Sequence, residues 1–247
     1  MITIKREGDE WMPEIDRTAE VKRECELDSA AIIAKIKDAG IVGMGGATFP
    51  THVKLSIPNG CKAEFLIING VECEPYLTSD HRTMLERGEE LLVGVEILKK
   101  ALGVDRAIIG VENNKPDAIA SLTGIIKEKK FAIEVEPLKV QYPQGGEKQL
   151  IAAVTGREVP PPPALPIHVG AVVCNASTAV AVYEAVQKNK PLIERVVTVT
   201  GKHLASTHNF LVRFGTPVST LLDIAGLPEG DNKLLNGGPM MGRCIVD

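Results

Sequence analysis

Residues 40–54 combine the features of a phosphate-binding loop. Four glycines fall within residues 40–46, and Lys54 follows them. Clustered glycines let the backbone approach a ligand closely, so that consecutive amide N–H groups surround an anion while a lysine supplies positive charge. The spacing matches neither the phosphate loop of nucleoside triphosphatases nor the Gly-x-Gly-x-x-Gly fingerprint. A glycine-rich turn between two elements, with Gly40 ending a helix, is the structural alternative.

A second group of candidate ligands consists of polar residues that directly follow apolar runs. They are Asn69, Glu72 and Glu74 after a first run, Asn113 and Asn114 after a second, residues 142–147 after a third and residues 175–178 after a fourth. Short apolar runs of this kind are typical of buried strands in a parallel sheet. Because ligands bind outside the carboxyl ends of such strands, these loops are expected to converge with the glycine-rich loop.

Each polar candidate has a structural alternative. Glu72 and Glu74 together suit acid/base work or polarisation of a ligand, and the alternative is a solvated acidic turn. Glu147 opens a helix, where an acidic residue also complements the helix dipole. Asn69 and Asn175 each offer a donor and an acceptor, or serve as turn and cap residues.

Aromatic, cysteine and histidine residues add little independent evidence. Phe49 and Tyr142 are placed to stack on a planar ring or to pack as ordinary hydrophobic residues. Cys73 has no convincing base beside it and is interpreted as unreactive. The five histidines form no spaced cluster, so no metal site is expected. The charged run at residues 80–82 is interpreted as a helix start with a structural role.

Strands and helices alternate along most of the chain, which predicts an α/β fold with a Rossmann- or flavodoxin-like parallel sheet and helices on both faces. The expected strands are residues 64–69, 106–112, 133–140 and 168–175. The expected helices are residues 29–40, 83–101, 115–129, 147–154 and one that is capped by Asn175 or Ser177 and runs to residue 187.

The texture of the sequence changes after residue 190. Residues 195–201 and 210–214 are rich in β-branched and apolar residues, residues 218–225 suit a short helix, and residues 234–239 suit a further strand. This order predicts a small β-grasp, ubiquitin-like α+β module. The expected division is therefore an N-terminal edge segment at 1–27, an α/β domain at 28–190 and the module at 191–247.

Composition excludes several classes of protein. The chain of 247 residues carries a net charge of −4 and shows no basic tract, so nucleic acid is not an expected partner. No apolar run is long enough to span a bilayer. The five scattered cysteines include no Cys-x-x-Cys, which suits a reducing cytosol and argues against an iron–sulfur cluster bound within this chain.

Four ordered motifs, at residues 43–54, 69–75, 142–150 and 236–242, carry a family resemblance. On them the chain resembles the flavin-binding subunit of respiratory complex I. It is more similar still to RnfC, a component of the Rnf ferredoxin–NAD electron transport complex. The resemblance covers roughly residues 28–247. It implies a domain that binds FMN without a covalent bond and takes hydride from NADH, and it implies that the sequence is a fragment of a longer protein.

The resemblance also implies roles for individual residues. The FMN phosphate end would be held by Gly43, Gly45 and Lys54, and the flavin lined by Asn69, Tyr142, Gly145, Asn175 and Thr178. Further cofactor-binding positions would be Gly46, Glu72 and Gly146, and the nicotinamide nucleotide would face Phe49, Glu74 and Glu147. No side chain would be catalytic, because the flavin carries out the redox chemistry.

The implied setting is an electron-transfer subunit on the cytoplasmic face of the cell membrane. Its partners would be other subunits of the membrane complex and a ferredoxin-type carrier, and its 4Fe-4S clusters would belong only to the full-length protein. Three positions depart from the family pattern: Met44 replaces an arginine, Val71 replaces an aspartate, and Thr48 replaces a glycine. A cobalamin-reductase-like or other soluble electron carrier, or a scaffold without flavin, are the alternatives.

Overall fold

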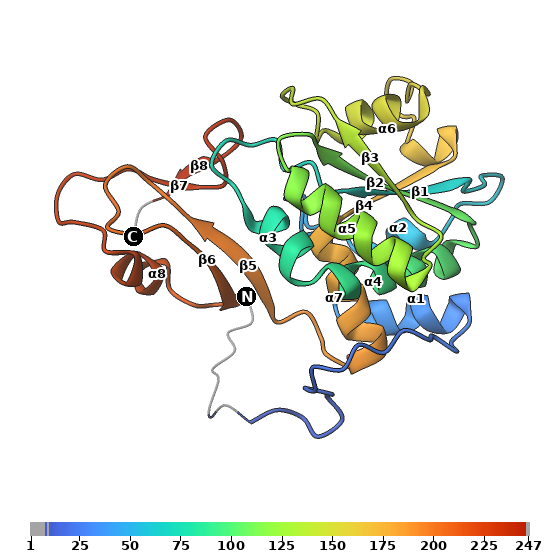
Figure 1. The fold of residues 1–247 in the computed structure, drawn as a ribbon, viewed down its shortest axis with the longest axis horizontal. Coiled ribbons are helices and arrows are strands. Elements are labelled where there is room, and N and C mark those ends of the chain that lie inside the picture. The colour runs from blue at the N-terminus through green and yellow to red at the C-terminus, as the bar shows by residue number, and fades with distance from the viewer. Residues whose placement is uncertain (1–7, 9, 246–247) are drawn as a thin grey trace.

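The structure, a computed structural model, describes residue 8 and residues 10–245. The first part of the expected 1–27 segment therefore lies outside the described residues, as do residues 246 and 247. Figure 1 shows a body of sheet and helices, from which a smaller C-terminal part extends to one side. We call residues 28–190 the α/β body and residues 191–245 the C-terminal module, a division that follows the sequence pattern.

A four-stranded parallel sheet forms the centre of the body. Its strands are β1 (Phe65–Asn69), β2 (Arg106–Glu112), β3 (Glu134–Leu138) and β4 (Ala171–Asn175). They lie in the order β3-β2-β1-β4, and every neighbouring pair is parallel. All four carboxyl ends therefore meet at one edge of the sheet, as the sequence predicted.

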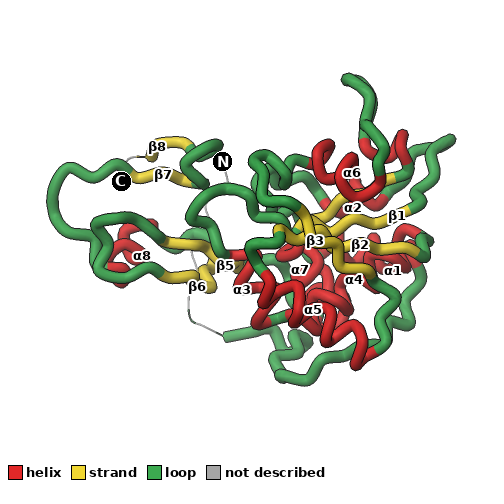
Figure 2. Tube along the Cα trace, turned by 45° about the horizontal axis from the view of Figure 1, so that its top comes forward, coloured by secondary structure: helices red, strands yellow, loops and turns green. Residues whose placement is uncertain are grey.

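Helices cover both faces of this sheet, which confirms the predicted fold class. The helices of the body are α1 (Ser29–Asp38), α2 (Thr51–Leu55), α3 (Ser79–Glu86), α4 (Gly88–Leu102), α5 (Pro116–Lys129), α6 (Glu147–Thr155) and α7 (Ala176–Lys188), with the 3₁₀ turn η1 (Pro166–Val169). Figures 1 and 2 show α6 on one side of the sheet and α1, α4, α5 and α7 on the other.

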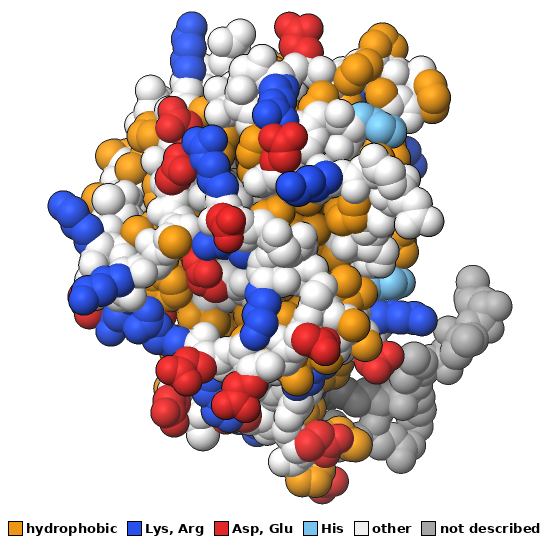
Figure 3. All heavy atoms as spheres, turned by 90° about the vertical axis from the view of Figure 1, so that its right-hand side faces the viewer, with side chains coloured by type: hydrophobic (Ala, Val, Ile, Leu, Met, Phe, Trp, Pro, Cys, Tyr) orange, Lys and Arg blue, Asp and Glu red, His pale blue; other side chains and the backbone are white. Residues whose placement is uncertain are grey.

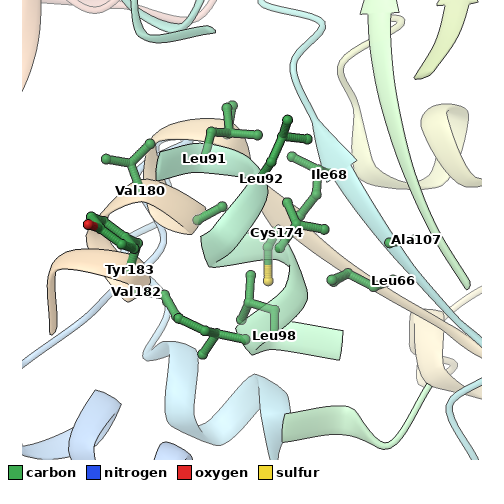
Figure 4. Close-up of a cluster of buried hydrophobic side chains, with 14 of the residues drawn as sticks. Leu66, Ile68, Leu91, Leu92, Leu98, Ala107, Cys174, Val180, Val182 and Tyr183 are labelled. Carbon is green, nitrogen blue, oxygen red and sulfur yellow. The ribbon is translucent and has the colours of Figure 1, made fainter. Parts of the chain in front are cut away.

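The alternation of side chains along the strands explains this division. In β1, Leu66 and Ile68 point into the larger core with α4 and α7, whereas Phe65 and Ile67 point into a smaller core with α6. Both faces are buried, so the strand reads as a continuous apolar run. Figure 4 shows the larger core, in which leucines of α4 meet residues of α7 over the sheet.

Close packing of α4 on α7 depends on one glycine. A Cβ atom at Gly94 would lie 2.0 Å from the carbonyl oxygen of Ala179, which is far inside contact distance. Glycine is therefore required there to let the two helices approach. This contact lies close to the start of α7, where the N-cap residue Asn175 and Thr178 are two of the predicted site residues.

Two expected boundaries in the body are wrong. The single helix expected at 83–101 is two helices, α3 and α4, which are separated at Arg87 with φ −128°. Gly88 follows the break and packs so closely on α5 that a Cβ would lie 2.8 Å from Ile125 Cδ1. The strand expected to start at residue 168 begins at Ala171, because Pro166 opens the turn η1 and Gly170, at φ +78°, ends it.

The C-terminal module consists of two hairpins and a helix. Its elements are β5 (Glu194–Val199), β6 (His208–Arg213), α8 (Val218–Ala225), β7 (Leu234–Asn236) and β8 (Arg243–Ile245). The order hairpin, helix, strand follows the β-grasp expectation. However, β5–β6 and β7–β8 are separate antiparallel sheets in the described residues, and β8 was not expected from the sequence.

Residues 10–27 lie along the body and are attached to it by polar contacts. The Lys188 ammonium at the end of α7 is buried, and it donates to Asp16 Oδ2 at 3.2 Å and to the carbonyl of Glu20 at 2.5 Å. On the face of the body shown in Figure 3, acidic and basic side chains are interspersed rather than gathered by sign. No helix within the described residues is long and apolar enough to cross a membrane.

Candidate functional site

The glycine-rich loop is a closed turn that stands above the carboxyl edge of the sheet. The Gly43 amide donates to the Phe49 carbonyl at 2.8 Å, and a β-bridge joins Val42 to Pro50. The Met44 amide donates to the Thr178 hydroxyl at 2.9 Å, which attaches the loop to the first turn of α7. The loop is therefore held at its base and at one side.

The tip of this loop presents unused backbone donors. Within the described part of the chain, the amides of Gly45, Gly46 and Ala47 have no hydrogen-bond acceptor, and all three residues are exposed. Gly46 has φ +121°, a conformation that favours glycine. Three adjacent unpaired amides offer donors of the kind that bind an anion such as a phosphate.

Thr48 departs from the family pattern with a structural consequence. Its φ is +51°, in the left-handed region that β-branched residues rarely adopt. The glycine that the family usually has at this position adopts that conformation without steric cost. Thr48 therefore holds a backbone conformation that a glycine would adopt more readily.

Lys54 and Glu147 are brought together by the fold, as the convergence of loops predicted. The Lys54 ammonium donates to Glu147 Oε1 at 3.0 Å and to the Val173 carbonyl of β4 at 2.8 Å. Lys54 lies on α2, directly after the glycine-rich loop, and Glu147 is the first residue of α6. Lys54, which was expected to bind a phosphate, is thus paired with Glu147, which was expected to face the nicotinamide nucleotide.

Asn69 and Asn175 occupy equivalent places on neighbouring strands. They are register partners at the ends of β1 and β4. Asn69 Nδ2 donates to the Gly145 carbonyl at 2.8 Å, which brings the loop before α6 to the same edge. Gly45 lies beside Asn175, because a Cβ on Gly45 would be 3.5 Å from Asn175 Cβ.

These contacts close into a ring around the carboxyl edge. Gly146 is the N-cap residue of α6, so it connects Gly145 directly to Glu147. From there the ring continues through Lys54 to β4, and across the sheet from Asn175 to Asn69. We call these residues the rim ring. Its members are Gly45, Lys54, Asn69, Gly145, Gly146, Glu147, Asn175 and, through Met44, Thr178.

Both asparagines of the rim ring keep capacity for a ligand. The Asn69 amide uses one N–H on Gly145 and accepts from the Val71 amide at 3.1 Å. The Asn175 amide accepts from the Thr178 amide at 3.2 Å. A primary amide has two N–H donors and two lone pairs, so each side chain retains at least one donor and one acceptor in a fixed direction.

Glu72 is bonded differently from the other predicted site residues. Its carboxylate accepts from the Ser79 hydroxyl and from the amides of Asp80 and His81, at 2.8–3.0 Å. A carboxylate at a helix N-terminus satisfies amides that have no partner within the helix. Burial, reinforced by the charge of Asp80, raises the pKa of Glu72. Contact with FMN therefore remains a prediction for a side chain that already caps α3.

Glu74 reaches the C-terminal module. Its Oε2 accepts from the Met240 amide at 3.0 Å, and a Cβ on Gly238 would overlap this carboxylate at 2.1 Å. The other oxygen, Oε1, is buried and has no hydrogen-bond partner among the described residues. Such an atom is costly to leave unpaired, so it is available to a donor on a ligand. This contact places the 236–242 motif beside the 69–75 motif.

The two aromatic candidates are partly exposed, as ligand-stacking residues must be. Phe49 is 48% exposed and Tyr142 is 39% exposed. Burial raises the pKa of Tyr142, with further contributions from the charges of Glu74 and Cys73, so its ring lies near that loop. Gly145 adjoins the same loop, because a Cβ there would be 3.1 Å from Cys73 Sγ. In the described part of the chain no hydrogen bond joins Phe49 to Glu74. These two residues, which were expected to face the nicotinamide nucleotide, are therefore not linked directly to each other.

The sequence interpretation missed Asp80. Its carboxylate accepts from Asn175 Nδ2 at 2.6 Å and from the Ser177 hydroxyl. Burial raises the pKa of Asp80, while these two donors and the charge of Arg195 oppose that shift. The only sequence signal was an acidic residue in a charged helix start, which does not show that α3 turns this side chain towards β4.

The remaining candidate groups are the cysteines and the side chains that could bind a metal ion. All five cysteines are free, and burial raises the pKa of the Cys174 thiol to about 11, so that it stays protonated at neutral pH. Among the described residues, no group of three or more His, Cys, Asp or Glu side chains is placed to hold a metal ion.

Two cavities lie between the body and the C-terminal module, and neither has the volume of a cofactor pocket. One of about 30 Å³ lies behind the glycine-rich loop beside Met44, Ser177 and Arg195. Another of about 120 Å³ lies between α3 and the β5–β6 hairpin. Ligand pockets usually measure at least about 300 Å³. Neither cavity is lined by the residues with unpaired amides or by the two asparagines of the rim ring.

The chemistry of the rim ring fits a flavin mononucleotide. The three unpaired amides and Lys54 suit a phosphate, and the remaining donors and acceptors of Asn69 and Asn175 suit the alternating N–H and C=O groups on the edge of a flavin ring. Comparison with known proteins decides the family. A family model described as the Nuo51 FMN-binding domain matches residues 36–184. The chain belongs to this Nuo51 FMN-binding domain family.

Curated relatives of this Nuo51-type chain match it along nearly its whole length. The C component of the proton-translocating ferredoxin:NAD(+) oxidoreductase complex of Clostridium ljungdahlii is 45% identical over 243 residues, which are 98% of this chain and 52% of that protein. The C component of the ion-translocating oxidoreductase complex of Rhodobacter capsulatus is 44% identical over 246 residues, 99% of this chain and 46% of that protein. The chain thus spans about half the length of these relatives, and its resemblance to RnfC is confirmed.

A solved structure supports the same fold. The crystal structure of an NAD+-reducing [NiFe]-hydrogenase in the air-oxidized state aligns with a TM-score of 0.70 at 26% identity. The alignment covers 85% of this chain and 41% of that chain. The Nuo51 match ends at residue 184, so it includes every residue of the rim ring and excludes the C-terminal module.

Proposed function

We propose that this chain is the FMN-binding electron-transfer part of an RnfC-type component of an ion-translocating ferredoxin:NAD oxidoreductase complex. The family match and the named relatives support the class of protein. The rim ring supplies the observation on which the proposal depends. Four chain segments that are far apart in sequence meet at one edge, and the amides at the tip of the glycine-rich loop have no acceptor among the described residues.

Each part of the rim ring has a task in this proposal. The amides of Gly45, Gly46 and Ala47 hold the phosphate, with Gly43 closing the base of the loop, and Lys54 adds charge. Asn69, Asn175 and the Gly145 carbonyl orient the ring edge, while Thr178 supports the loop from behind. Tyr142 covers one side of the ring. When bound, FMN accepts hydride from NADH and releases electrons singly, and the protein contributes orientation and exclusion of water.

The Lys54–Glu147 pair gives the two ligands a common contact. Lys54 already has two acceptors, and one N–H of its ammonium remains for a phosphate. Glu147 limits the net positive charge at this point, so the phosphate end competes with a carboxylate for the lysine. We assign Phe49, Glu74 and Glu147 to the nicotinamide nucleotide, because Phe49 is exposed and Glu74 retains an unpaired oxygen.

The setting of this activity is part of the proposal, and the names of the relatives support membership of a complex of several subunits. Electrons would leave the flavin for 4Fe-4S clusters in the remainder of the full-length protein and reach a ferredoxin-type carrier. The chain would lie on the cytoplasmic face of the cell membrane, among the other subunits of the complex. The names describe proteins about twice as long as this chain. The partners that they name are therefore proposed for this chain.

Titration of FMN into the purified chain tests the proposal. Wild type is expected to bind FMN and to absorb near 450 nm, a property of the flavin itself. Lys54→Ala removes a charge-assisted hydrogen bond, and Gly45→Val puts a side chain between the loop and the ligand. Each is expected to weaken binding by about ten-fold or more.

Lys148→Ala is the matched control. Lys148 adjoins Glu147 on α6, but its ammonium bonds the Pro160 carbonyl at 3.0 Å, away from the rim ring. Its loss should leave FMN affinity unchanged. Equal affinity in wild type, Lys54→Ala and Gly45→Val would disprove the assignment of the loop. Wild type that binds no FMN at all would favour the scaffold without flavin.

A further inference from the structure

The start of α7 contains an amide whose two ends are both fixed. Asn175 Oδ1 accepts from the Thr178 amide at 3.2 Å, and Asn175 Nδ2 donates to Asp80 Oδ2 at 2.6 Å. Reversing the amide would direct its NH₂ group at a backbone N–H and its carbonyl at a carboxylate. Both arrangements are repulsive, so Asp80 and the helix start together select one orientation.

The Asp80 side chain is itself fixed by hydrogen bonds. It is the second residue of α3, and its other oxygen accepts from the Ser177 hydroxyl. Two charged or titratable groups face it from other segments: Glu72 from the loop after β1, and Arg195 from β5. Its carboxylate thus joins α3, α7 and the first strand of the C-terminal module.

Arg195 extends this network to the glycine-rich loop. Its Nη2 donates to the Met44 carbonyl at 3.2 Å, while the Met44 amide donates to the Thr178 hydroxyl at 2.9 Å. Met44 is therefore held from the module on one side and from α7 on the other. Arg195 of the module and Asp80, which bonds the start of α7, carry opposite charges and attract each other.

We propose that Asp80 is a positioning residue of the site. It fixes the direction of the Asn175 amide and, together with Arg195, the position of the glycine-rich loop. The assignment deepens the proposed flavin site and rests on it for its effect on FMN. Asp80 does not contact the cofactor. It acts through Asn175, which presents its remaining N–H and lone pair in a direction set before the cofactor arrives.

Asn69 provides an internal comparison. Its amide is oriented by the Gly145 carbonyl and the Val71 amide, which are both backbone groups. Only Asn175 depends on another side chain for its orientation, among the two asparagines of the rim ring. A substitution at Asp80 should therefore disturb one side of the ring and leave the Asn69 side as it was.

The first test measures the effect on the amide without any cofactor. The side-chain NH₂ resonances of Asn175 and Asn69 are recorded by ¹⁵N NMR in wild type and in Asp80→Ala. Loss of the carboxylate acceptor is expected to move the Asn175 NH₂ signal upfield and to speed its hydrogen exchange, while the Asn69 signal stays. An Asn175 signal unchanged in a folded Asp80→Ala protein overturns the proposal.

The second test measures FMN affinity. Asp80→Ala should weaken binding by about ten- to hundred-fold at pH 8, as expected for loss of a hydrogen bond to a charged group. Asp80→Asn, which keeps an acceptor oxygen, should recover part of that loss. The ratio of dissociation constants for Asp80→Ala and wild type should fall as pH decreases, because wild-type Asp80 then takes up a proton. Phosphate ionisation cancels in this ratio.

Asp117→Asn is the control for general loosening of α3. Asp117 lies on α5, and its carboxylate contacts His81 of α3 at 2.8 Å, on the exposed side. It should leave both the Asn175 signal and FMN affinity unchanged. Wild-type affinity in Asp80→Ala, or equal losses in Asp80→Ala and Asp117→Asn, contradicts the positioning role. If wild type itself binds no FMN, the proposed function fails, and the NMR comparison alone decides the role of Asp80.

Discussion

The α/β body and the C-terminal module are stabilised in different ways. In the described part of the chain, the buried hydrophobic residues run from Ile32 to Val186, and Ala225 is the one member from the module. Apolar residues of the module are instead exposed, for example Leu211 at 63% and Ile224 at 58%. The body is therefore stabilised by apolar burial, and the module contributes little to a core of its own.

Polar contacts attach the module to the body. The Thr78 amide donates to the Thr198 hydroxyl at 3.2 Å, and Lys190 bridges Glu184 of α7 and Glu194 of β5. Arg195 and Glu74 make the two contacts already described at the site. The rim ring therefore lies on elements that share a buried apolar core. The C-terminal module beside it is attached through hydrogen bonds and ion pairs.

Leucine truncations in the two regions give the largest contrast. Leu92 on α4 is fully buried, so Leu92→Ala is expected to lower the free energy of unfolding by about 2–5 kcal/mol. Leu211→Ala in β6 should change it by less than about 0.5 kcal/mol, because that side chain is mostly in water. Denaturant unfolding of both variants measures the difference. Similar losses in the two would contradict the contrast between the regions.

The ion pairs at the junction should show an intermediate effect. Glu184 accepts from Arg87 at 2.9 Å and from Lys190 at 2.8 Å, and its side chain is only 15% exposed. Both partners lie in the body, but Lys190 also bonds Glu194 of β5. Glu184→Gln therefore leaves Lys190 less firmly placed and should destabilise the attachment of the module by about 1–3 kcal/mol. Hydrogen exchange is expected to rise in β5 and β6 while β4 keeps its protection.

Glu86→Gln is the matched control for this prediction. Its partner Arg82 lies on the same helix, and both side chains are exposed, so the pair is worth little. Faster exchange in β4 than in β5 after Glu184→Gln would show that the junction supports the body rather than the module.

The N-terminal segment should show the smallest effect, and one that depends on pH. The hydrogen bond from Lys22, together with those from Thr18 and Lys188, lowers the pKa of Asp16 well below its usual range. Its stabilisation is therefore fully present above the unfolded-state pKa, near 4, and is lost as pH falls through the lower folded-state value. Asp16→Asn should make residues 10–27 more susceptible to proteolysis at pH 7, and the difference should shrink below about pH 4. A difference that grows as pH falls would reverse the sign.

The sequence predicted the parts of the site that depend on periodicity and on strand ends. Apolar runs located β1, β2 and β4, and the rule that ligands meet the carboxyl ends of parallel strands placed Asn69, Asn175 and Lys54 together. The strand β2 and the helix α8 have the expected boundaries. These elements follow from patterns within a few residues of sequence.

Features that depend on distant partners were not predictable. The start of α3 at Ser79 depends on the Glu72 carboxylate, which caps amides across a loop, and not on a local capping residue. The break at Arg87 reflects the close approach of Gly88 to α5. Asp80 enters the site because α3 turns it towards Asn175. No spacing in the sequence carries this information.

A crystal structure of the chain with FMN tests the central claim most directly. The phosphate is expected within hydrogen-bond distance of the Gly45, Gly46 and Ala47 amides, and the flavin ring against the side chains of Asn69 and Asn175. Flavin found instead in the cavity between α3 and the β5–β6 hairpin, with no contact to either asparagine, would contradict that claim.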